Sequence, residues 1–325
     1  MSKPNIVFLG AGAVGGYFGA RLIEHDMARV TFLVRPARRD LLVREGLRIE
    51  SPHGNLAVAV EARTAEELVG AAPDYLFITA KAYDLDTAIK ALMPVVGPNT
   101  CIVPLLNGVA HIERLNGAFG ADRILGGTVS LQVEQRQDGV VQHLNSWQII
   151  TIGEQSGAMS ERVQRLKRAL DGAKLDATAS SEIMQKMWEK LVMLATLAGL
   201  TTLFDATVGE IASAPGGVAI ARSLLATHAA AAAHAGYPVS EEQLTQWRAM
   251  FSDPNSGFSA SMRADMRRGG PVEADHIIGF MLDRVRDAGL DSTLPDAVNA
   301  NLKIYEARLG AGRIVANPKS SAGTP

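Results

Sequence analysis

A lysine stands near the start of an apolar stretch in the middle of this chain. The segment from Trp188 to Phe204 reads WEKLVMLATLAGLTTLF, and its only charged residues are Glu189 and Lys190. Burial disfavours the charged form of an ammonium group and lowers its pKa toward neutral pH, which suits a general acid. Alternatively, the methylenes of Lys190 pack at the edge of a buried helix while its ammonium extends to solvent. The residues alone leave both interpretations open.

A second chemical pattern lies near the N-terminus, where residues 10–15 read GAGAVG. This G-x-G-x-x-G pattern directly follows an apolar run, opens a helical pattern and precedes a second strand-like run, as in dinucleotide-binding units. We expect Gly10 to allow the tight turn, Gly12 to admit a pyrophosphate, and Gly15 to let helix and strand pack closely. The alternative is a glycine-rich turn that binds no ligand. The remaining residues of the predicted cofactor loop are Ala11, Ala13 and Val14.

The residue at the end of the second strand indicates which dinucleotide is bound. An acid there would hold the ribose 2′-OH of NAD, whereas an arginine accommodates the 2′-phosphate of NADP. The sequence reads TFLVRPARR, which contains no acid, and Arg35 stands at the strand end with Arg38 and Arg39 behind it. We therefore predict NADP(H) as the cofactor and Arg35 as a contact. The alternative is that Arg35 is a solvated loop residue.

In the order of its motifs the chain resembles the ketopantoate reductase family, the 2-dehydropantoate 2-reductases. The glycine loop is common to many dehydrogenases, whereas the ordered set of Lys81, Asn107, Lys190 and Glu273 is more specific. The resemblance spans nearly the whole chain and rests on GAGAVGG (10–16), LVR (33–35), TAKAYD (79–84), LLNGV (105–109), WEKL (188–191) and SMRADMRRGGPVEADHIIGF (261–280).

The resemblance implies a role for each matching residue. Lys190 matches the catalytic lysine, which meets the negative charge that hydride transfer places on the carbonyl oxygen. Glu273 and Asn107 match residues at the carbonyl end of the substrate, and Asn107 is also near the nicotinamide. Ser261 matches a serine that receives the substrate carboxylate, and Lys81 matches a residue on the cofactor side. Alternatively, Glu273 is an acid in the first turn of a helix, Asn107 belongs to an Asn-Gly turn, Ser261 is an exposed serine and Lys81 is a surface lysine.

The chain departs from the family where the fourth carbon of ketopantoate, which carries a hydroxyl, should be recognised. Family members usually place asparagines one and two turns after the catalytic lysine and before a Gly-Glu pair. These positions are Leu194, Ala198 and Val208 here. A site built to hydrogen-bond a hydroxyl discriminates strongly, whereas an apolar pocket discriminates weakly. Either nearby threonines substitute, or the substrate has an apolar tail.

The elements that must position these residues follow from the pattern of apolar runs. Strand-like and helical segments alternate up to about residue 153, which predicts a parallel sheet covered by helices, with antiparallel strands over 139–153. From about Ser160 the pattern is almost entirely helical. We predict an α/β Rossmann-type domain over 1–178, an all-α domain over 179–312 and a disordered tail over 313–325. The resemblance implies a helical domain like the C-terminal domain of 6-phosphogluconate dehydrogenase.

The composition and net charge of the chain argue against several classes of function. The chain has 325 residues, 47% of them hydrophobic, and a net charge of −2, which gives no electrostatic case for nucleic acid or an anionic membrane. The single cysteine permits no intrachain disulfide and fits a reducing cytoplasm. We expect no metal, because the sequence contains no Cys/His cluster. The expected partner is a small 2-oxo acid, and a homodimer is one assembly that the sequence allows.

The predicted activity is NADPH-dependent reduction of a 2-oxo acid to a 2-hydroxy acid. The resemblance points to 2-dehydropantoate and pantothenate biosynthesis, and the replaced asparagines to another branched 2-oxo acid. One alternative is a two-domain dehydrogenase of a hydroxy acid or polyol phosphate. Another is a regulator that binds NADPH without turnover, against which the combination of Lys190, Asn107 and Glu273 argues.

Overall fold

The computed structural model describes residues 2–314, and its chain divides into two compact units. The first unit is Met1–Met187, and the second, helical unit begins at Trp188. This division falls inside one long helix, whereas the sequence led us to expect it between residues 178 and 179. Of the predicted tail, residues 315–325 lie outside the described part, and Arg313 and Ile314 belong to no helix or strand.

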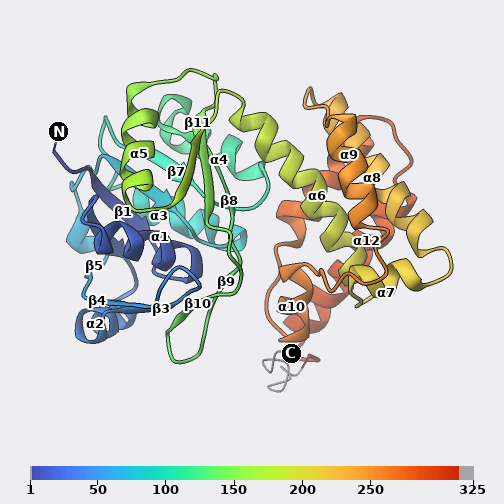
Figure 1. The fold of residues 1–325 in the computed structure, drawn as a ribbon, viewed down its shortest axis with the longest axis horizontal. Coiled ribbons are helices and arrows are strands. Elements are labelled where there is room, and N and C mark those ends of the chain that lie inside the picture. The colour runs from blue at the N-terminus through green and yellow to red at the C-terminus, as the bar shows by residue number, and fades with distance from the viewer. Residues whose placement is uncertain (1, 315–325) are drawn as a thin grey trace. The chain divides into compact units, whose positions relative to one another are not determined.

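The N-terminal unit is built on a five-stranded parallel sheet (Figure 1). Its strand order is β5-β2-β1-β6-β7, so the chain starts in the middle of the sheet and moves first to one edge and then to the other. Buried aromatic rings fill its centre: the rings of Phe8 and Phe77 stack at 4.6 Å, and Phe32 lies 5.8 Å from Phe8. The strands are β1 (Asn5–Leu9), β2 (Arg29–Leu33), β5 (Glu61–Arg63), β6 (Tyr75–Ile78) and β7 (Cys101–Pro104).

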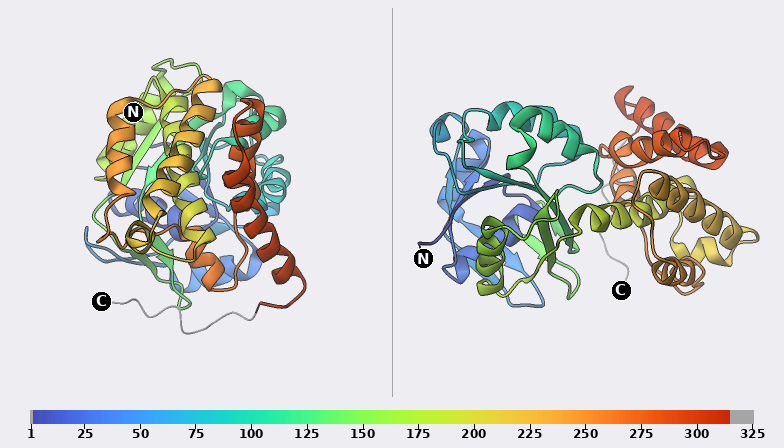
Figure 2. Two further views of the ribbon diagram at one scale, coloured as in Figure 1. Left: turned by 90° about the vertical axis from the view of Figure 1, so that its right-hand side faces the viewer. Right: turned by 90° about the horizontal axis from the view of Figure 1, so that it is seen from above.

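Helices cover both faces of this sheet, as the alternating pattern predicted. Helices α1 and α5 contact each other on one side, and α3 and α4 contact each other on the other side (Figure 2, right). The helices of this unit are α1 (Ala13–Glu24), α2 (Pro36–Glu45), α3 (Leu85–Leu92), α4 (Ala110–Phe119) and α5 (Glu161–Gly172). Its short 3-10 turns are η1 (Glu66–Leu68), η2 (Ala82–Asp84) and η3 (Ala121–Arg123).

Two smaller sheets complete the unit. One has the order β4-β3-β10-β9 and the other β12-β11-β8. The prediction of antiparallel strands over 139–153 is confirmed in part, because β10 pairs antiparallel with β9 and β11 pairs antiparallel with β8. Each strand also pairs in parallel with a second neighbour, β10 with β3 and β11 with β12. The strands are β3 (Leu47–Glu50), β4 (Leu56–Val58), β8 (Leu125–Ser130), β9 (Val133–Gln135), β10 (Val141–His143), β11 (Ile149–Glu154) and β12 (Asp176–Ala179).

The second unit is helical throughout the part that the structure describes. Helix α6 starts before it, at Ile183, and α11 packs on α8 and α12. No helix among residues 2–314 combines the length and apolar character needed to span a membrane. The helices are α6 (Ile183–Leu203), α7 (Val208–Ser213), α8 (Gly217–His234), α9 (Glu241–Met250), α10 (Ser261–Arg267), α11 (Phe280–Asp287) and α12 (Thr293–Gly310).

One predicted helix has an unexpected form. The helical pattern over 272–288 predicts one continuous helix, but the chain forms a π-helical turn, η4 (Asp275–Gly279), before α11 begins. The short helices α7 and α10 were not predicted. Both contain few residues, so their apolar periodicity is too short to recognise.

Candidate active site

The glycine loop lies between β1 and α1, and its three glycines differ in backbone conformation and in what a side chain would contact. Gly10 has φ of +92°, a left-handed conformation that glycine adopts without steric cost. A Cβ on Gly15 would lie 2.5 Å from Oγ1 of Thr79 and 2.7 Å from the Gly10 carbonyl oxygen, so only glycine fits. A Cβ on Gly12 would meet no atom within 4 Å. The space in front of Gly12 is therefore open.

The open space belongs to a cleft of about 650 Å³ in the N-terminal unit. The N-terminus of α1 faces it through Gly12, the N-cap residue, and no side chain caps the free N–H groups of the first turn. Such a helix N-terminus attracts an anion. The cleft is lined by the glycine loop, the ends of β2 and β6, and α3. Of the predicted cofactor residues, its lining includes Gly10, Ala11, Gly12 and Arg35, but not Ala13, Val14, Gly15, Lys81 or Asn107.

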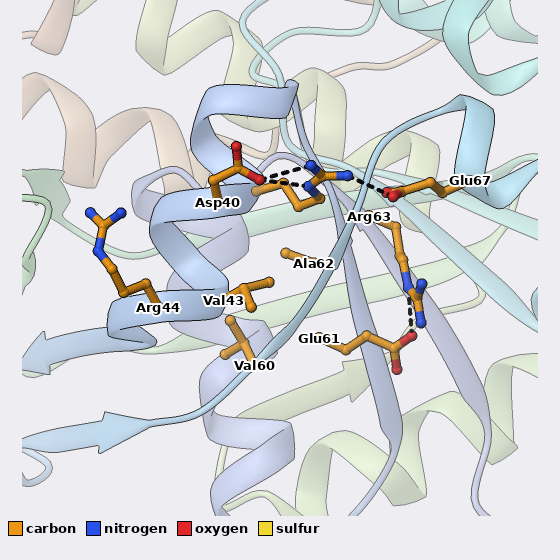
Figure 3. A pocket seen from close by; sticks show the side chains of 9 residues that line it. Asp40, Val43, Arg44, Val60, Glu61, Ala62, Arg63 and Glu67 are labelled. Atoms are coloured by element: carbon orange, nitrogen blue, oxygen red, sulfur yellow. Dashed lines mark hydrogen bonds and ion pairs between the residues drawn. The ribbon is translucent and has the colours of Figure 1, made fainter.

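The three arginines after β2 take different positions. Arg35 is the exposed N-cap residue of α2 and lines the cleft. Arg38 also lines the cleft, and burial lowers the pKa of its guanidinium. Arg39 lies in a separate hollow between α2 and β5, where it donates to Asp40 at 2.8 Å and to Glu67 at 2.6 Å (Figure 3). Arg35 and Arg38 therefore line the cleft, whereas Arg39 is paired with acids outside it.

An acid that sequence reasoning missed also lines the cleft. Glu66 belongs to η1, which follows β5, the strand next to β2. Hydrogen bonds from the Thr64 side chain and from its own backbone N–H lower the pKa of Glu66 and keep it ionised. No sequence signal at the end of β2 could reveal this residue, because β5 becomes the neighbour of β2 only in the folded sheet.

Lys81 and Asn107 follow neighbouring strands of the sheet. Lys81 comes after β6 and precedes η2, and Asn107 comes after β7. The strands β6 and β7 are parallel, so both residues lie at the carboxyl edge that also carries the glycine loop. This is the edge at which ligands bind in open α/β sheets.

Lys190 lies on α6 in the helical unit, and its side chain is half-buried. Two residues earlier, Trp188 stacks on Tyr237 at 5.1 Å and lies 5.7 Å from the ring of Phe280. Desolvation by burial lowers the pKa of Lys190 from its ordinary value of 10.5 to about 8. An ammonium with this pKa is protonated in part at neutral to mildly alkaline pH and can release its proton.

The three residues that we predict to replace the family's asparagines differ in exposure. Leu194 follows Lys190 by one turn of α6 and is half-buried. Ala198, a further turn along, is 4% exposed, and Val208 at the start of α7 is 2% exposed. Buried side chains of this size act by excluding polar groups and by setting the position of their neighbours.

Ser261 and Glu273 also belong to the helical unit. Ser261 is the exposed first residue of α10. Glu273 is 9% exposed and comes two residues before the π-helical turn η4, of a kind that often occurs at functional sites. The turn is held from α12, because Nζ of Lys303 lies 2.5 Å from Oδ1 of Asp275.

Comparison with known families covers both units. The model of "Ketopantoate reductase PanE/ApbA" matches residues 6–157, and that of its C-terminal domain matches residues 182–306. The chain belongs to the ketopantoate reductase family. The family is one of oxidoreductases, and its fold of a parallel-sheet α/β domain followed by a helical domain is the one described above.

Three known proteins illustrate what the chain is similar to. The uncharacterized oxidoreductase YkpB of Bacillus subtilis is 32% identical over 92% of this chain and 98% of its own length. The 2-dehydropantoate 2-reductase of Mesorhizobium japonicum is 28% identical over 91% of this chain and 95% of its own. The crystal structure of the Geobacter metallireducens enzyme of that name has a TM-score of 0.83 at 25% identity, covering 92% of this chain and 99% of the other.

Proposed function

We propose that this ketopantoate reductase family member reduces a 2-oxo acid to a 2-hydroxy acid with NADPH. The observation that carries the proposal is Lys190, whose pKa desolvation lowers to about 8. By sequence resemblance this lysine matches the family's catalytic lysine. The N-terminal unit supports it with a cleft at the glycine loop. The left-handed Gly10, the open space at Gly12 and the uncapped start of α1 all fit a bound dinucleotide.

Three residues of the helical unit and Asn107 of the N-terminal unit act on the substrate. Ser261 binds the substrate carboxylate, and Glu273 together with Asn107 orients the carbonyl. The bound nicotinamide supplies the hydride. Lys190 donates the proton that converts the carbonyl oxygen to a hydroxyl, and it is then reprotonated from solvent. A positioned acid of this kind contributes about 10²- to 10⁴-fold to the rate.

The cofactor preference rests on charge in the cleft. Arg35 and Arg38 favour the 2′-phosphate of NADPH, and the ionised Glu66 opposes it. We propose that the two arginines outweigh the single carboxylate. Substituting both arginines by methionine should then lower kcat/KM for NADPH far more than for NADH, which steady-state kinetics with each cofactor measures. An equal loss for both cofactors would show that neither arginine reads the 2′-phosphate.

The substrate is proposed to be a branched 2-oxo acid with an apolar tail. Leu194, Ala198 and Val208 offer no hydrogen bond to the hydroxyl of ketopantoate. The test is NADPH oxidation with ketopantoate, 2-oxoisovalerate and longer branched 2-oxo acids. We expect kcat/KM for 2-oxoisovalerate to equal or exceed that for ketopantoate. A large preference for ketopantoate would contradict the apolar tail, and no oxidation with any 2-oxo acid would contradict the reductase itself.

A further inference from the structure

The carbonyl oxygen of Ala11 in the glycine loop receives two side-chain donors from distant parts of the N-terminal unit. Nη2 of Arg38 on α2 lies 3.4 Å from it, and Nε2 of Gln135 at the end of β9 lies 3.3 Å from it. The same Nε2 lies 3.5 Å from the carbonyl oxygen of Gly139. Two carbonyl acceptors around one atom identify it as the amide nitrogen.

The Ala11–Gly12 peptide is one that could rotate easily. A flip of this peptide changes ψ of Ala11 and φ of Gly12, and φ of Gly12 is −81° here. Glycine populates positive and negative φ about equally, so Gly12 offers little resistance to the change in φ that a peptide flip requires. A flip would exchange the directions of the Ala11 carbonyl and the Gly12 N–H, which point opposite ways in a trans peptide.

Such a flip would change which peptide group, the carbonyl oxygen or the N–H, faces a bound phosphate. Ala11, Gly12, Arg38 and Gln135 all line the same cleft. A carbonyl oxygen turned into a phosphate site repels the anion, whereas an N–H turned into it attracts the anion. The hydrogen bonds from Arg38 and Gln135 hold the Ala11 carbonyl toward these two side chains. The Gly12 N–H then points the opposite way, where it can attract a pyrophosphate.

We propose that Gln135 is a cofactor-positioning residue, which with Arg38 anchors the Ala11 carbonyl and so holds the glycine loop in the orientation that admits the pyrophosphate. The inference rests on the proposed function, since it requires a dinucleotide in the cleft. Arg38 has a second candidate role at the 2′-phosphate. Gln135 is uncharged, and its effect on the loop can be measured separately.

The test is Gln135→Met, which keeps the length of the side chain and removes its donor. The control is Gln137→Met, an exposed glutamine two residues along in the same hairpin. Isothermal titration gives the dissociation constants of NADPH, NADH, ADP-ribose and adenosine 2′,5′-bisphosphate. The last ligand keeps the adenosine and the 2′-phosphate but has no pyrophosphate. A role confined to folding would not distinguish between these ligands.

We expect Gln135→Met to weaken NADPH, NADH and ADP-ribose alike by about 3- to 10-fold, the effect of losing one ordinary hydrogen bond. Binding of adenosine 2′,5′-bisphosphate should stay within about 2-fold of wild type, and Gln137→Met should change none of the four. Unchanged ADP-ribose binding, or an equal loss for adenosine 2′,5′-bisphosphate, would overturn the role of Gln135. Failure of the wild-type protein to bind any dinucleotide would instead overturn the proposed function, and this inference with it.

Discussion

At the scale of single residues, burial changes the acid–base behaviour of two side chains in the helical unit. It lowers the pKa of Lys190 to about 8 and that of His228 to about 3. In both cases desolvation disfavours the charged form. The consequences differ, because we propose that Lys190 acts in its protonated form, whereas His228 is buried with its ring in the neutral form.

The rate of the proposed reaction should therefore depend on the protonation of Lys190. The proton donor is the ammonium, so kcat should be constant below the pKa and fall as the pH rises through about 8. Lys190→Met should lower kcat by about 10²- to 10⁴-fold and abolish this alkaline limb. Steady-state kinetics from about pH 6 to pH 10 measures both effects. The control is Lys186→Met, one turn earlier on α6, which should keep the alkaline limb. If the limb persisted in Lys190→Met, Lys190 would be excluded as the proton donor.

His228 should make the stability of the protein depend on pH. Its ring is 3% exposed, and Nδ1 lies 3.0 Å from Oγ1 of Thr196, whose hydroxyl donates to the Val192 carbonyl at 2.8 Å. Nδ1 therefore carries a proton and the ring is neutral. Because the folded-state pKa lies below the unfolded value, this stability is complete above about pH 6.5 and is lost as the pH falls toward 3.

We predict that the free energy of unfolding falls by about 1.4 kcal/mol per pH unit below pH 6.5 on account of His228. His228→Asn keeps a donor near Thr196 but cannot ionise, so it should flatten this slope while lowering stability at neutral pH. Urea titrations at pH values between about 7 and 4 measure the slope. The exposed His234→Asn on the same helix is the control, and an equal flattening there would contradict the role of His228.

At the scale of elements, the sequence predicted segments with a strong local pattern and missed those that depend on distant pairing. The strands β1, β2, β6 and β7 and the long helices follow from apolar runs and periodicity. The sheet β4-β3-β10-β9 does not, because β10 pairs in parallel with β3 from a remote part of the chain. The π-helical turn η4 also escaped prediction, since apolar periodicity predicts a helix but does not show where a turn contains an extra residue.

The same reasoning explains which parts of the candidate site were predictable. Gly10, Gly12 and Arg35 belong to one continuous β1–α1–β2 unit with a fixed spacing, and they line one cleft. Gln135 and Glu66 line it too, but they come from β9 and from the turn after β5. Their places depend on sheet neighbours that no local pattern encodes. Lys190, Ser261 and Glu273 were identified through a family resemblance, because a helix periodicity does not show which face carries chemistry.

Alanine substitutions at two glycines near the start of α1 should distinguish effects on dinucleotide binding from effects on stability. Gly12→Ala has an allowed backbone conformation and open space for its Cβ, so it should leave stability unchanged or raise it by up to about 1 kcal/mol. The Cβ would occupy the cleft, however, and should weaken dinucleotide binding by at least about 10-fold. Gly15→Ala should instead destabilise by about 1–3 kcal/mol, because its Cβ would overlap Thr79 and the Gly10 carbonyl. Thermal unfolding and titration with NADPH measure the two properties, and a stable Gly12→Ala that binds NADPH normally would contradict the cleft assignment.

At the scale of the whole molecule, the two units carry different parts of the proposed reaction. The N-terminal unit contains the glycine loop, Arg35 and Arg38, which we assign to the dinucleotide. The helical unit contains Lys190, Ser261 and Glu273, which we assign to the substrate. Helix α6 runs across the division between Met187 and Trp188, so the residue proposed as the proton donor stands at the very start of the second unit.

This division predicts that changes in the two units act on different constants and combine without coupling. Gly12→Ala should raise the dissociation constant of NADPH, and Lys190→Met should lower kcat while leaving that constant within about 2-fold of wild type. Substitutions at sites that share no partner usually have additive free energies. The double variant should therefore bind NADPH like Gly12→Ala. At saturating cofactor, its kcat relative to wild type should equal the product of the relative kcat values of the two single variants. Titration and steady-state kinetics on all four proteins measure the cycle. If Lys190→Met weakened NADPH binding as much as Gly12→Ala does, the assignment of cofactor and proton donor to separate units would be wrong.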